Sequence, residues 1–223
     1  MAVDLETYHQ LKTTLDEKGV TLIAVSKTKP VEDIQILYDA GHRDFGENYV
    51  QELVQKQDVL PKDIRWHFIG HLQSNKVKMI APFVHLIHGV DSVKLLEVID
   101  KEGKKLNKKI NCLLQVHIAI EDTKYGLDIQ ETRQAASCYF IEKKYEHVEL
   151  CGLMGMASFS DDTTLVDKEF KSLKQLFDEI HRVHKNAAHF NIVSMGMSGD
   201  YMLAIDNGST MVRVGSLLFG KRS

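Results

Sequence analysis

Short apolar runs alternate with stretches of helical periodicity along the whole chain. The apolar runs have the length and the β-branched content of strands, and the stretches between them repeat apolar residues every three or four positions. We expect strands at 21–27, 42–46, 64–69, 85–89, 110–118, 148–156, 191–195 and 211–217. We expect helices at 4–18, 31–41, 48–57, 74–81, 92–102, 128–144, 164–185 and 199–207.

This alternation predicts an α/β fold, a single (β/α)8 TIM-type barrel with an extra N-terminal helix. Eight strands, each followed by a helix except the last, match the element count of that fold. Runs such as 150–154 are apolar throughout, which is typical of parallel strands covered on both faces. An open doubly wound sheet is the alternative, but the turn 27–30 carries no G-x-G-x-x-G sequence and indicates no dinucleotide site. With three prolines and no low-complexity segment, residues 1–223 are expected to form one domain.

The composition narrows the classes of partner. Hydrophobic residues make up 43% of the chain and charged residues 26%, as in a soluble protein with a substantial core. The net charge of −3 lacks the basic surplus that nucleic acid requires, and the basic stretch 101–109 has no aromatic residues nearby for base stacking. No apolar run is long enough to span a membrane, and residues 1–7 lack the apolar core of a secretory signal. The three cysteines form no C-x-x-C pair, so we expect a reducing, cytoplasmic location.

Candidate chemistry lies at the ends of the strands, because barrels of this class carry their sites at the carboxyl ends. Lys27 ends the most apolar run of the N-terminal region. Its amine would become a nucleophile if burial kept it unprotonated, although a lysine at a strand end normally keeps its amine in water. Asn48 follows the second strand, and His67 near the end of the third is either a ligand-facing side chain or a hydrogen-bonded core histidine.

The segments after strands seven and eight have the chemistry of an anion cradle. Glycines and serines between Ser194 and Asp200 offer backbone N–H groups and hydroxyls, and Gly215–Ser216 is the pair that a barrel phosphate site would add. Each segment alone is also an ordinary turn, in which Ser198 or Asp200 caps a helix. Their occurrence together after strands seven and eight favours a phosphate site.

Arg213 lies within an apolar strand, where it needs a carboxylate or a ligand as partner. A structural salt bridge is the commoner explanation for such an arginine. No set of histidines, cysteines and carboxylates has metal-ligand spacing, so no metal site is expected.

The chain resembles the pyridoxal-5′-phosphate homeostasis protein family, also called the proline synthetase co-transcribed homologues. Six runs carry the resemblance, in matching order over nearly the whole chain: 24–30, 45–52, 66–76, 152–154, 194–198 and 209–215. Two departures are visible, since the N-terminal helix looks short for the family and strand six continues as Gly155–Ser158. Neither departure touches the motifs that match cofactor positions.

The resemblance implies a barrel similar to the N-terminal domain of alanine racemase and pyridoxal 5′-phosphate as cofactor. It implies that Lys27 forms a Schiff base with the cofactor and that Arg213 faces the pyridine nitrogen. The remaining cofactor-binding positions that it implies are Ser198, Gly215 and Ser216 at the phosphate, Ser194 and Met197 in the same turn, and Asn48 and His67 in the pocket.

The implied pairing of Arg213 bears on function. Arginine only donates hydrogen bonds, so a ring nitrogen that faces it stays unprotonated and is a poor electron sink. Racemisation needs two acid/base groups around the α-carbon, and Lys27 is one candidate. The racemases take the opposing tyrosine from a second domain, and 223 residues leave no room for that domain. We therefore expect intracellular buffering and delivery of the cofactor rather than catalysis.

Two other functions stay open at the level of sequence. One is a pyridoxal-phosphate-dependent amino-acid racemase or a related fold-type III enzyme, and the other is a barrel that acts on a sugar phosphate without a cofactor. For the homeostasis function, the expected partners are pyridoxal phosphate itself and pyridoxal-phosphate-dependent apoenzymes, and the chain is expected to be a monomer.

Overall fold

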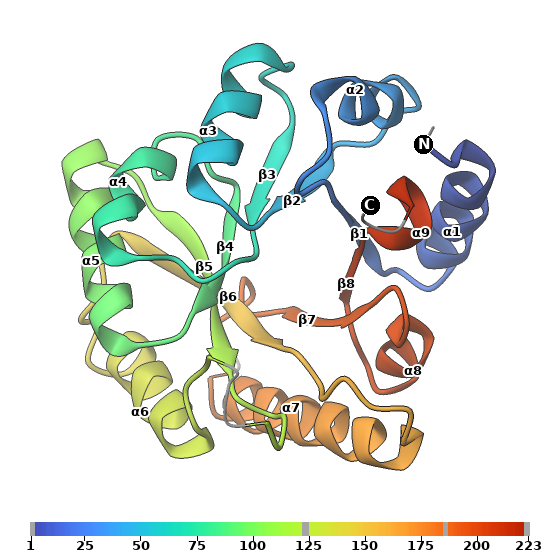
Figure 1. The fold of residues 1–223 in the computed structure, drawn as a ribbon. Coiled ribbons are helices and arrows are strands. Elements are labelled where there is room, and N and C mark those ends of the chain that lie inside the picture. The colour runs from blue at the N-terminus through green and yellow to red at the C-terminus, as the bar shows by residue number, and fades with distance from the viewer. Residues whose placement is uncertain (1–2, 122–124, 185–186, 221–223) are drawn as a thin grey trace.

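Eight parallel strands close into a barrel in which each strand pairs with the next and β8 pairs with β1 (Figure 1). The computed structural model describes residues 3–121, 125–184 and 187–220. The predicted (β/α)8 barrel is confirmed. The strands are β1 Thr21–Val25, β2 Asp44–Glu47, β3 Arg65–Phe68, β4 Leu86–Val90, β5 Ile110–Val116, β6 Val148–Gly155, β7 Ile192–Met197 and β8 Met211–Val214.

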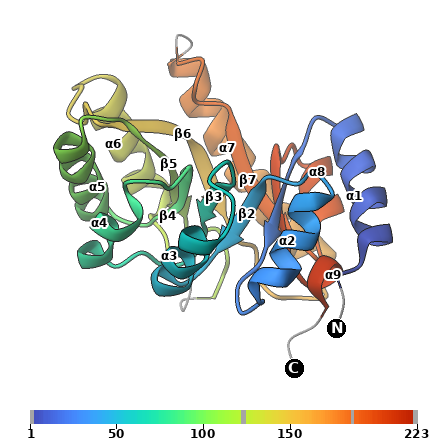
Figure 2. The same ribbon diagram turned by 90° about the horizontal axis from the view of Figure 1, so that it is seen from above.

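Helices form a ring outside the strands, as the views from two directions show (Figures 1 and 2). They are α1 Leu5–Glu17, α2 Val31–Asp39, α3 Val50–Val59, the 3-10 turn η1 Ser74–Lys76, α4 Val77–Ile80, α5 Val93–Leu106, α6 Ile129–Phe140, α7 Thr163–Val183, α8 Tyr201–Asp206 and α9 Ser216–Phe219. The extra N-terminal helix α1 lies against α9, where the N–H of Asp4 donates to the carbonyl of Leu218 at 3.0 Å. Within the described ranges, no helix has both the length and the apolar character needed to cross a membrane.

The longer helices follow from local sequence signals. The Asp162 carboxylate caps α7 by accepting from the N–H groups of Thr164 and Leu165. Asp128 and Glu131 form a reciprocal capping box at the start of α6. The buried positions of α7 recur every three or four residues and turn one face of the helix to the barrel: Val166, Glu169, Phe170, Leu173, Leu176, Phe177 and Ile180.

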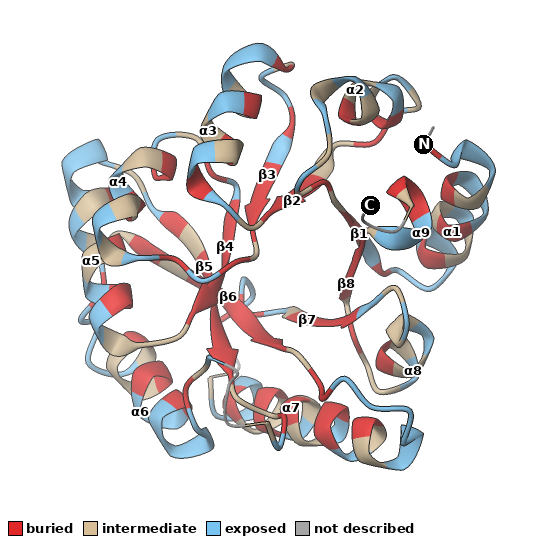
Figure 3. Ribbon diagram, viewed as in Figure 1, coloured by how far each residue is buried: buried red, intermediate tan, exposed pale blue. Residues whose placement is uncertain are grey.

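The apolar core has two parts. The larger part lies between the strands and the helices, where the strands are buried and the outward helix faces are exposed (Figure 3). The smaller part fills the barrel itself with Ile23, Leu86, Leu113, Cys151, Met154 and Met211. Buried polar side chains share the strands with this second part, and they are the starting point for the site.

Several predicted boundaries were wrong. The run predicted as a strand to residue 217 ends at Val214, and α9 follows it where no helix was expected. Leu218 and Phe219 are buried on that short helix, and an apolar run of this length fits a strand and a buried helix face equally well. Strand two begins at Asp44 rather than at residue 42, and the helix predicted at 74–81 is divided into η1 and α4. Helix α6 ends at Phe140, and residue 185 of the helix predicted at 164–185 lies outside the described residues.

His42 makes the fold sensitive to acid. It is buried, its Nε2–H donates to the carbonyl of Asp44 at 2.8 Å, and its ring meets the rings of Tyr8 and Phe45 edge-on. Burial lowers the pKa of His42 to about 4. Because the unfolded chain binds the proton near pH 6.5 and the folded chain does not, stability is lost as pH falls below that value. We expect His42 alone to cost about 2 kcal/mol of unfolding free energy at pH 5, at about 1.36 kcal/mol per pH unit.

The measurement is the urea midpoint at pH 7 and at pH 5. The matched variant is His42→Gln, whose amide can still donate to the carbonyl of Asp44 but takes up no proton. We expect a smaller loss of stability between the two pH values for the variant. An equal loss in both proteins would contradict the role given to His42.

Candidate functional site

The predicted site residues lie at two depths of the barrel. Lys27 follows β1, Asn48 follows β2, and Ser198 follows β7. Gly215 and Ser216 follow β8, so these five share the C-terminal mouth. Met197, the last residue of β7, is exposed at the same mouth, whereas Ser194, Arg213 and His67 lie deeper, within their strands and buried.

The backbone next to Lys27 is strained. Thr28 has a φ of 63°, in the left-handed region that β-branched residues rarely enter. Its N–H donates to Oε1 of Glu52 at 2.7 Å, which helps to hold this conformation. Strain of this kind concentrates at functional sites, where the surrounding structure must over-determine it. The segment that carries Lys27 is therefore held in one shape.

A buried ion cluster supports that segment from below. Lys56 Nζ donates to Glu47 at 2.7 Å, to Glu52 at 2.6 Å and to the carbonyl of Ser26 at 2.8 Å, while Ser26 Oγ donates to Glu47 at 2.7 Å. Burial raises the pKa of Glu47, and the Lys56 ammonium opposes this shift. This cluster was not predicted from the sequence, although the i, i+4 spacing of Glu52 and Lys56 is a signal for one of its pairs.

Asn48 presents an unsatisfied acceptor at the mouth. Its Oδ1 atom is buried and has no hydrogen-bond partner among the described residues, and the same holds for Oε2 of Glu47. Gly70 makes this packing possible, since a Cβ at that position would come within 2.3 Å of the carbonyl oxygen of Asn48. Buried acceptors without partners are costly, so a donor from a ligand fits here.

The two glycine- and serine-rich turns come together as predicted from their places after strands seven and eight. The N–H of Gly215 donates to Ser198 Oγ at 3.2 Å, and the N–H of Met197 donates to the Asp200 carboxylate. Gly196 has a φ of +96°, and a Cβ there would meet the Cβ of Ala204 at 2.6 Å. Only glycine fits this turn.

Arg213 is held inside the barrel by neutral acceptors. Its Nη1 donates to the carbonyl of Ser194 at 2.8 Å and to Ser194 Oγ at 2.7 Å, and its Nη2 donates to the carbonyl of Gly155 at 3.1 Å. No ion pair to Arg213 occurs within the described ranges, which leaves the predicted salt-bridge explanation without support. Burial lowers the pKa of Arg213 to about 10, so the guanidinium stays protonated at neutral pH. It keeps donor groups for a ligand, because an arginine has five N–H groups in total.

His67 lies on the opposite side of the barrel interior from the mouth that carries Lys27. Its Nε2 lies 3.1 Å from Oδ1 of Asp44, and its Nδ1 lies 3.0 Å from Nε2 of His88. His88 Nδ1 lies 3.0 Å from Ser194 Oγ, so His67 reaches the site through two intermediates. Neither His88 nor Asp44 was predicted from the sequence to belong to the site, although a histidine within the otherwise apolar strand β4 is a visible signal.

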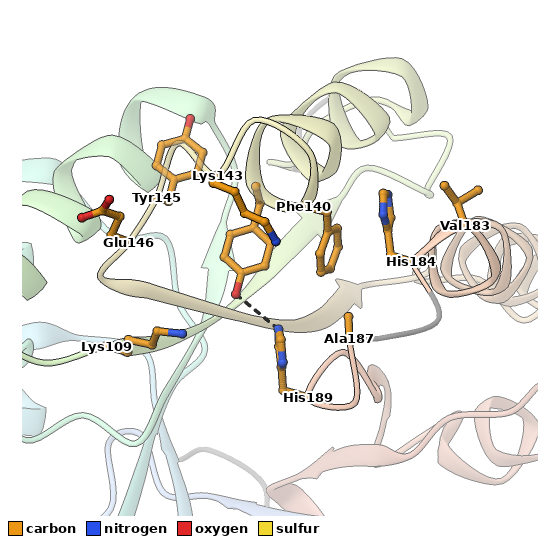
Figure 4. Close-up of a pocket in the computed structure, with 10 residues that line it drawn as sticks. Lys109, Phe140, Lys143, Tyr145, Glu146, Val183, His184, Ala187 and His189 are labelled. Carbon is orange, nitrogen blue, oxygen red and sulfur yellow. Dashed lines mark hydrogen bonds between the residues drawn. The ribbon is translucent and has the colours of Figure 1, made fainter.

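Two cavities lie away from Lys27. A cavity of about 550 Å³ opens beside the ends of α6 and α7, where the rings of Phe140 and His184 stack and Tyr139 bonds His189 at 3.2 Å (Figure 4). A second cavity, of about 250 Å³, lies at the N-terminal mouth of the barrel and contains His67. His67 is the one predicted site residue that lines either of them within the described part of the chain.

Comparisons with known proteins give the chain a family. Residues 6–223 match the family described as alanine racemase, N-terminal domain. A pyridoxal phosphate homeostasis protein of Pasteurella multocida is 40% identical over 209 residues, which are 92% of this chain and 88% of the relative. The chain belongs to the pyridoxal phosphate homeostasis protein family.

Solved structures agree with membership of the homeostasis family. PipY of Synechococcus elongatus without PLP has a TM-score of 0.89 and 34% identity, and the match covers 96% of this chain and 99% of PipY. PipY with PLP bound has a TM-score of 0.84 and 33% identity, with the same coverage. The similar curated relatives are named as homeostasis proteins and not as enzymes. The family resemblance stated from the sequence is confirmed.

Proposed function

We propose that this protein binds pyridoxal 5′-phosphate reversibly at the C-terminal mouth and buffers or delivers it. One observation carries the proposal. Three neighbouring strands present an amine, a donor-only guanidinium and a paired glycine–serine turn, contributed by Lys27, Arg213 and the Ser198–Gly215 contact. These groups match the aldehyde, the pyridine nitrogen and the phosphate of the cofactor.

The residues present fit the cofactor group by group. Ser198, Gly215 and Ser216 offer hydroxyl and backbone donors to the phosphate, with Met197 and Ser194 shaping the same turn. The unpartnered Oδ1 of Asn48 lies at the mouth where a donor of the ligand would satisfy it. Arg213 would donate to the ring nitrogen, and His67 would act on the site only through His88 and Ser194.

Lys27 is the proposed tether. When bound, the cofactor supplies an aldehyde carbon that accepts an amine. Lys27 would offer its amine to that carbon, and the aldehyde oxygen would leave as water. The step is reversible, because water or a competing amine can release the cofactor.

Arg213 favours holding the cofactor over catalysis with it. A guanidinium only donates hydrogen bonds and cannot accept one from a protonated ring nitrogen, so the ring stays unprotonated and stabilises a carbanion poorly. This agrees with a storage and delivery function, whereas a racemase would also need a second acid/base group opposite Lys27.

Exposed apolar side chains surround the mouth and suit delivery to another protein. Phe159 is 96% exposed and Ile120 72% exposed, and Tyr49 and Tyr125 are exposed as well, on the segments that follow β2, β5 and β6. A pyridoxal-phosphate-dependent apoenzyme is the proposed partner for this rim, and a monomer would leave the rim open to it. The free thiols of Cys112, Cys138 and Cys151 support a reducing, cytoplasmic setting.

The test of the function combines a spectrum with a chemical map. The purified protein is titrated with pyridoxal phosphate, its visible absorbance is recorded, and the adduct is reduced with borohydride and located by peptide mapping. We expect a yellow protein and an adduct on Lys27. An adduct on another lysine, or no adduct, would refute the proposal. In a separate assay in deuterated water, rapid loss of the α-proton from an L-amino acid would favour the racemase instead.

A further inference from the structure

A line of hydrogen bonds crosses the barrel interior from one mouth toward the other. It runs from Asp44 through His67, His88 and Ser194 to Arg213, and we call it the relay. The four contacts measure 3.1, 3.0, 3.0 and 2.7 Å in that order. All of its members except Asp44 are buried. The relay therefore joins a partly exposed carboxylate to the buried guanidinium.

The chemistry of the two ends fixes the direction of every bond. Arg213 can only donate, so Ser194 Oγ accepts from it. An ionised Asp44 can only accept, so His67 Nε2–H donates to it. If both imidazoles are neutral, His67 Nδ1 must accept from Nε2–H of His88. His88 Nδ1 then accepts from the Ser194 hydroxyl, and every polar atom along the relay is satisfied.

The surroundings keep both imidazoles neutral. Burial lowers the pKa of His67 and of His88, and the Arg213 guanidinium lowers that of His88 further. Asp44 opposes the shift of His67, and it also pairs with Arg65, whose Nε donates to Oδ1 at 2.7 Å. His85 also faces the pair, and its ring centre lies 5.2 Å from that of His67.

Solvent meets the far end of the relay at the N-terminal mouth. The cavity of about 250 Å³ is lined there by Asp44, Arg65, His67 and His85. The side chain of Arg65 is about half exposed. Hydrogen bonds thus connect this mouth to the buried guanidinium of Arg213.

We propose that Asp44, His67 and His88 are positioning residues for Arg213. Because the hydroxyl hydrogen of Ser194 is committed to His88, its lone pairs are turned to Nη1 of Arg213 and hold the guanidinium in one orientation. That orientation aims its remaining donors at the ligand. The inference rests on the proposed function insofar as the ligand is pyridoxal phosphate, whereas the direction of the relay is a property of the unliganded protein.

The first experiment uses the wild-type protein without cofactor. Its histidine side chains are labelled with ¹⁵N, and the tautomers of His67 and His88 are read by NMR at pH 7. We expect both rings to be neutral, with the proton on Nε2 and none on Nδ1. A proton on Nδ1 of either ring, or a doubly protonated ring, overturns the relay whether or not the protein binds pyridoxal phosphate.

The second experiment compares His88→Leu with His85→Leu, a matched histidine at the same mouth that lies outside the relay. Both variants are loaded with pyridoxal phosphate labelled at the ring nitrogen. We expect His88→Leu to move the ¹⁵N signal of the ring and to weaken binding about tenfold, and His85→Leu to do neither. The amide of a glutamine can donate and accept, so His88→Gln should return the ¹⁵N signal of the ring part of the way to its wild-type position.

A ring signal that is identical in His88→Leu and the wild type would overturn the positioning role. Should His88→Leu fail to fold, Asp44→Asn replaces it, since that change lies at the opposite mouth and removes only the charge at the end of the relay. A wild-type protein that binds no pyridoxal phosphate would refute the proposed function and leave the tautomer result standing.

Discussion

Lys27→Ala is expected to abolish the covalent attachment of pyridoxal phosphate while leaving the barrel folded. Lys27 follows β1, and side chains hold the backbone on either side of it. Glu52 accepts from the N–H of Thr28, and Lys56 donates to the carbonyl of Ser26. Removing the amine of Lys27 therefore removes the tether without removing the support. The phosphate and ring contacts remain, so binding should weaken on the order of a hundredfold, or about 2.8 kcal/mol at 1.4 kcal/mol per tenfold.

The measurement is the visible spectrum during a cofactor titration, together with the borohydride map. Lys29→Ala is the matched control, because Lys29 lies two positions away in the same segment and its Nζ donates to the carbonyl of Phe219 at 2.7 Å. That control should keep a reducible adduct on Lys27. Lys27→Arg separates the tether from the charge, since it keeps the cation and should still give no adduct. A reducible adduct in Lys27→Ala would contradict the role of Lys27.

Arg213→Glu should change the protonation of the bound cofactor. A carboxylate accepts a hydrogen bond that a guanidinium cannot, so the pyridine nitrogen would gain a proton in the variant. The variant also sets a carboxylate beside the carbonyls of Ser194 and Gly155, which lose the donors that they have now. Leaving these buried acceptors unpaired costs about 1–3 kcal/mol each, so a lower melting temperature is expected as well.

The readouts are the visible spectrum and the ¹⁵N signal of the ring nitrogen. Arg213→Lys serves as the second variant, because it keeps the charge and only loses the fork geometry. We expect the ring to stay unprotonated in Arg213→Lys and to become protonated in Arg213→Glu. The same ring signal and the same affinity in all three proteins would refute the pairing.

The barrel was predictable because short strand-like runs alternate with stretches of helical periodicity along the whole chain. The end of the chain was not, since Leu217, Leu218 and Phe219 follow an apolar strand after only two small residues, Gly215 and Ser216. Their helix depends on tertiary contacts, in which α9 packs on α1. Periodicity alone cannot separate these two outcomes in so short a run.

The residues of the mouth were predictable for a different reason. Parallel strands end on the same side of a barrel. Lys27, Ser198 and Gly215 were therefore expected at the same mouth once a barrel was predicted. The relay needed more, because it depends on which side chains of five different strands face the barrel interior and reach one another. The sequence shows that His88 lies within β4, but it does not show that Ser194 on β7 is its partner. That contact depends on the register of the strands around the barrel. The cofactor roles of the single residues stay predictions.

The pairing of β1 with β8 also has a consequence for biosynthesis. Ile23 lies opposite Arg213 in that pairing. The barrel can therefore close only after β8, the last strand to be synthesised, has been made. Chains emerge from the ribosome with the N-terminus first. Lys27 is thus exposed early, while the groups that would hold the ring and the phosphate arrive at the end of translation. A nascent or C-terminally shortened chain would hold the cofactor only by the amine of Lys27. Tight retention of the cofactor is therefore expected only after synthesis of β8 is complete.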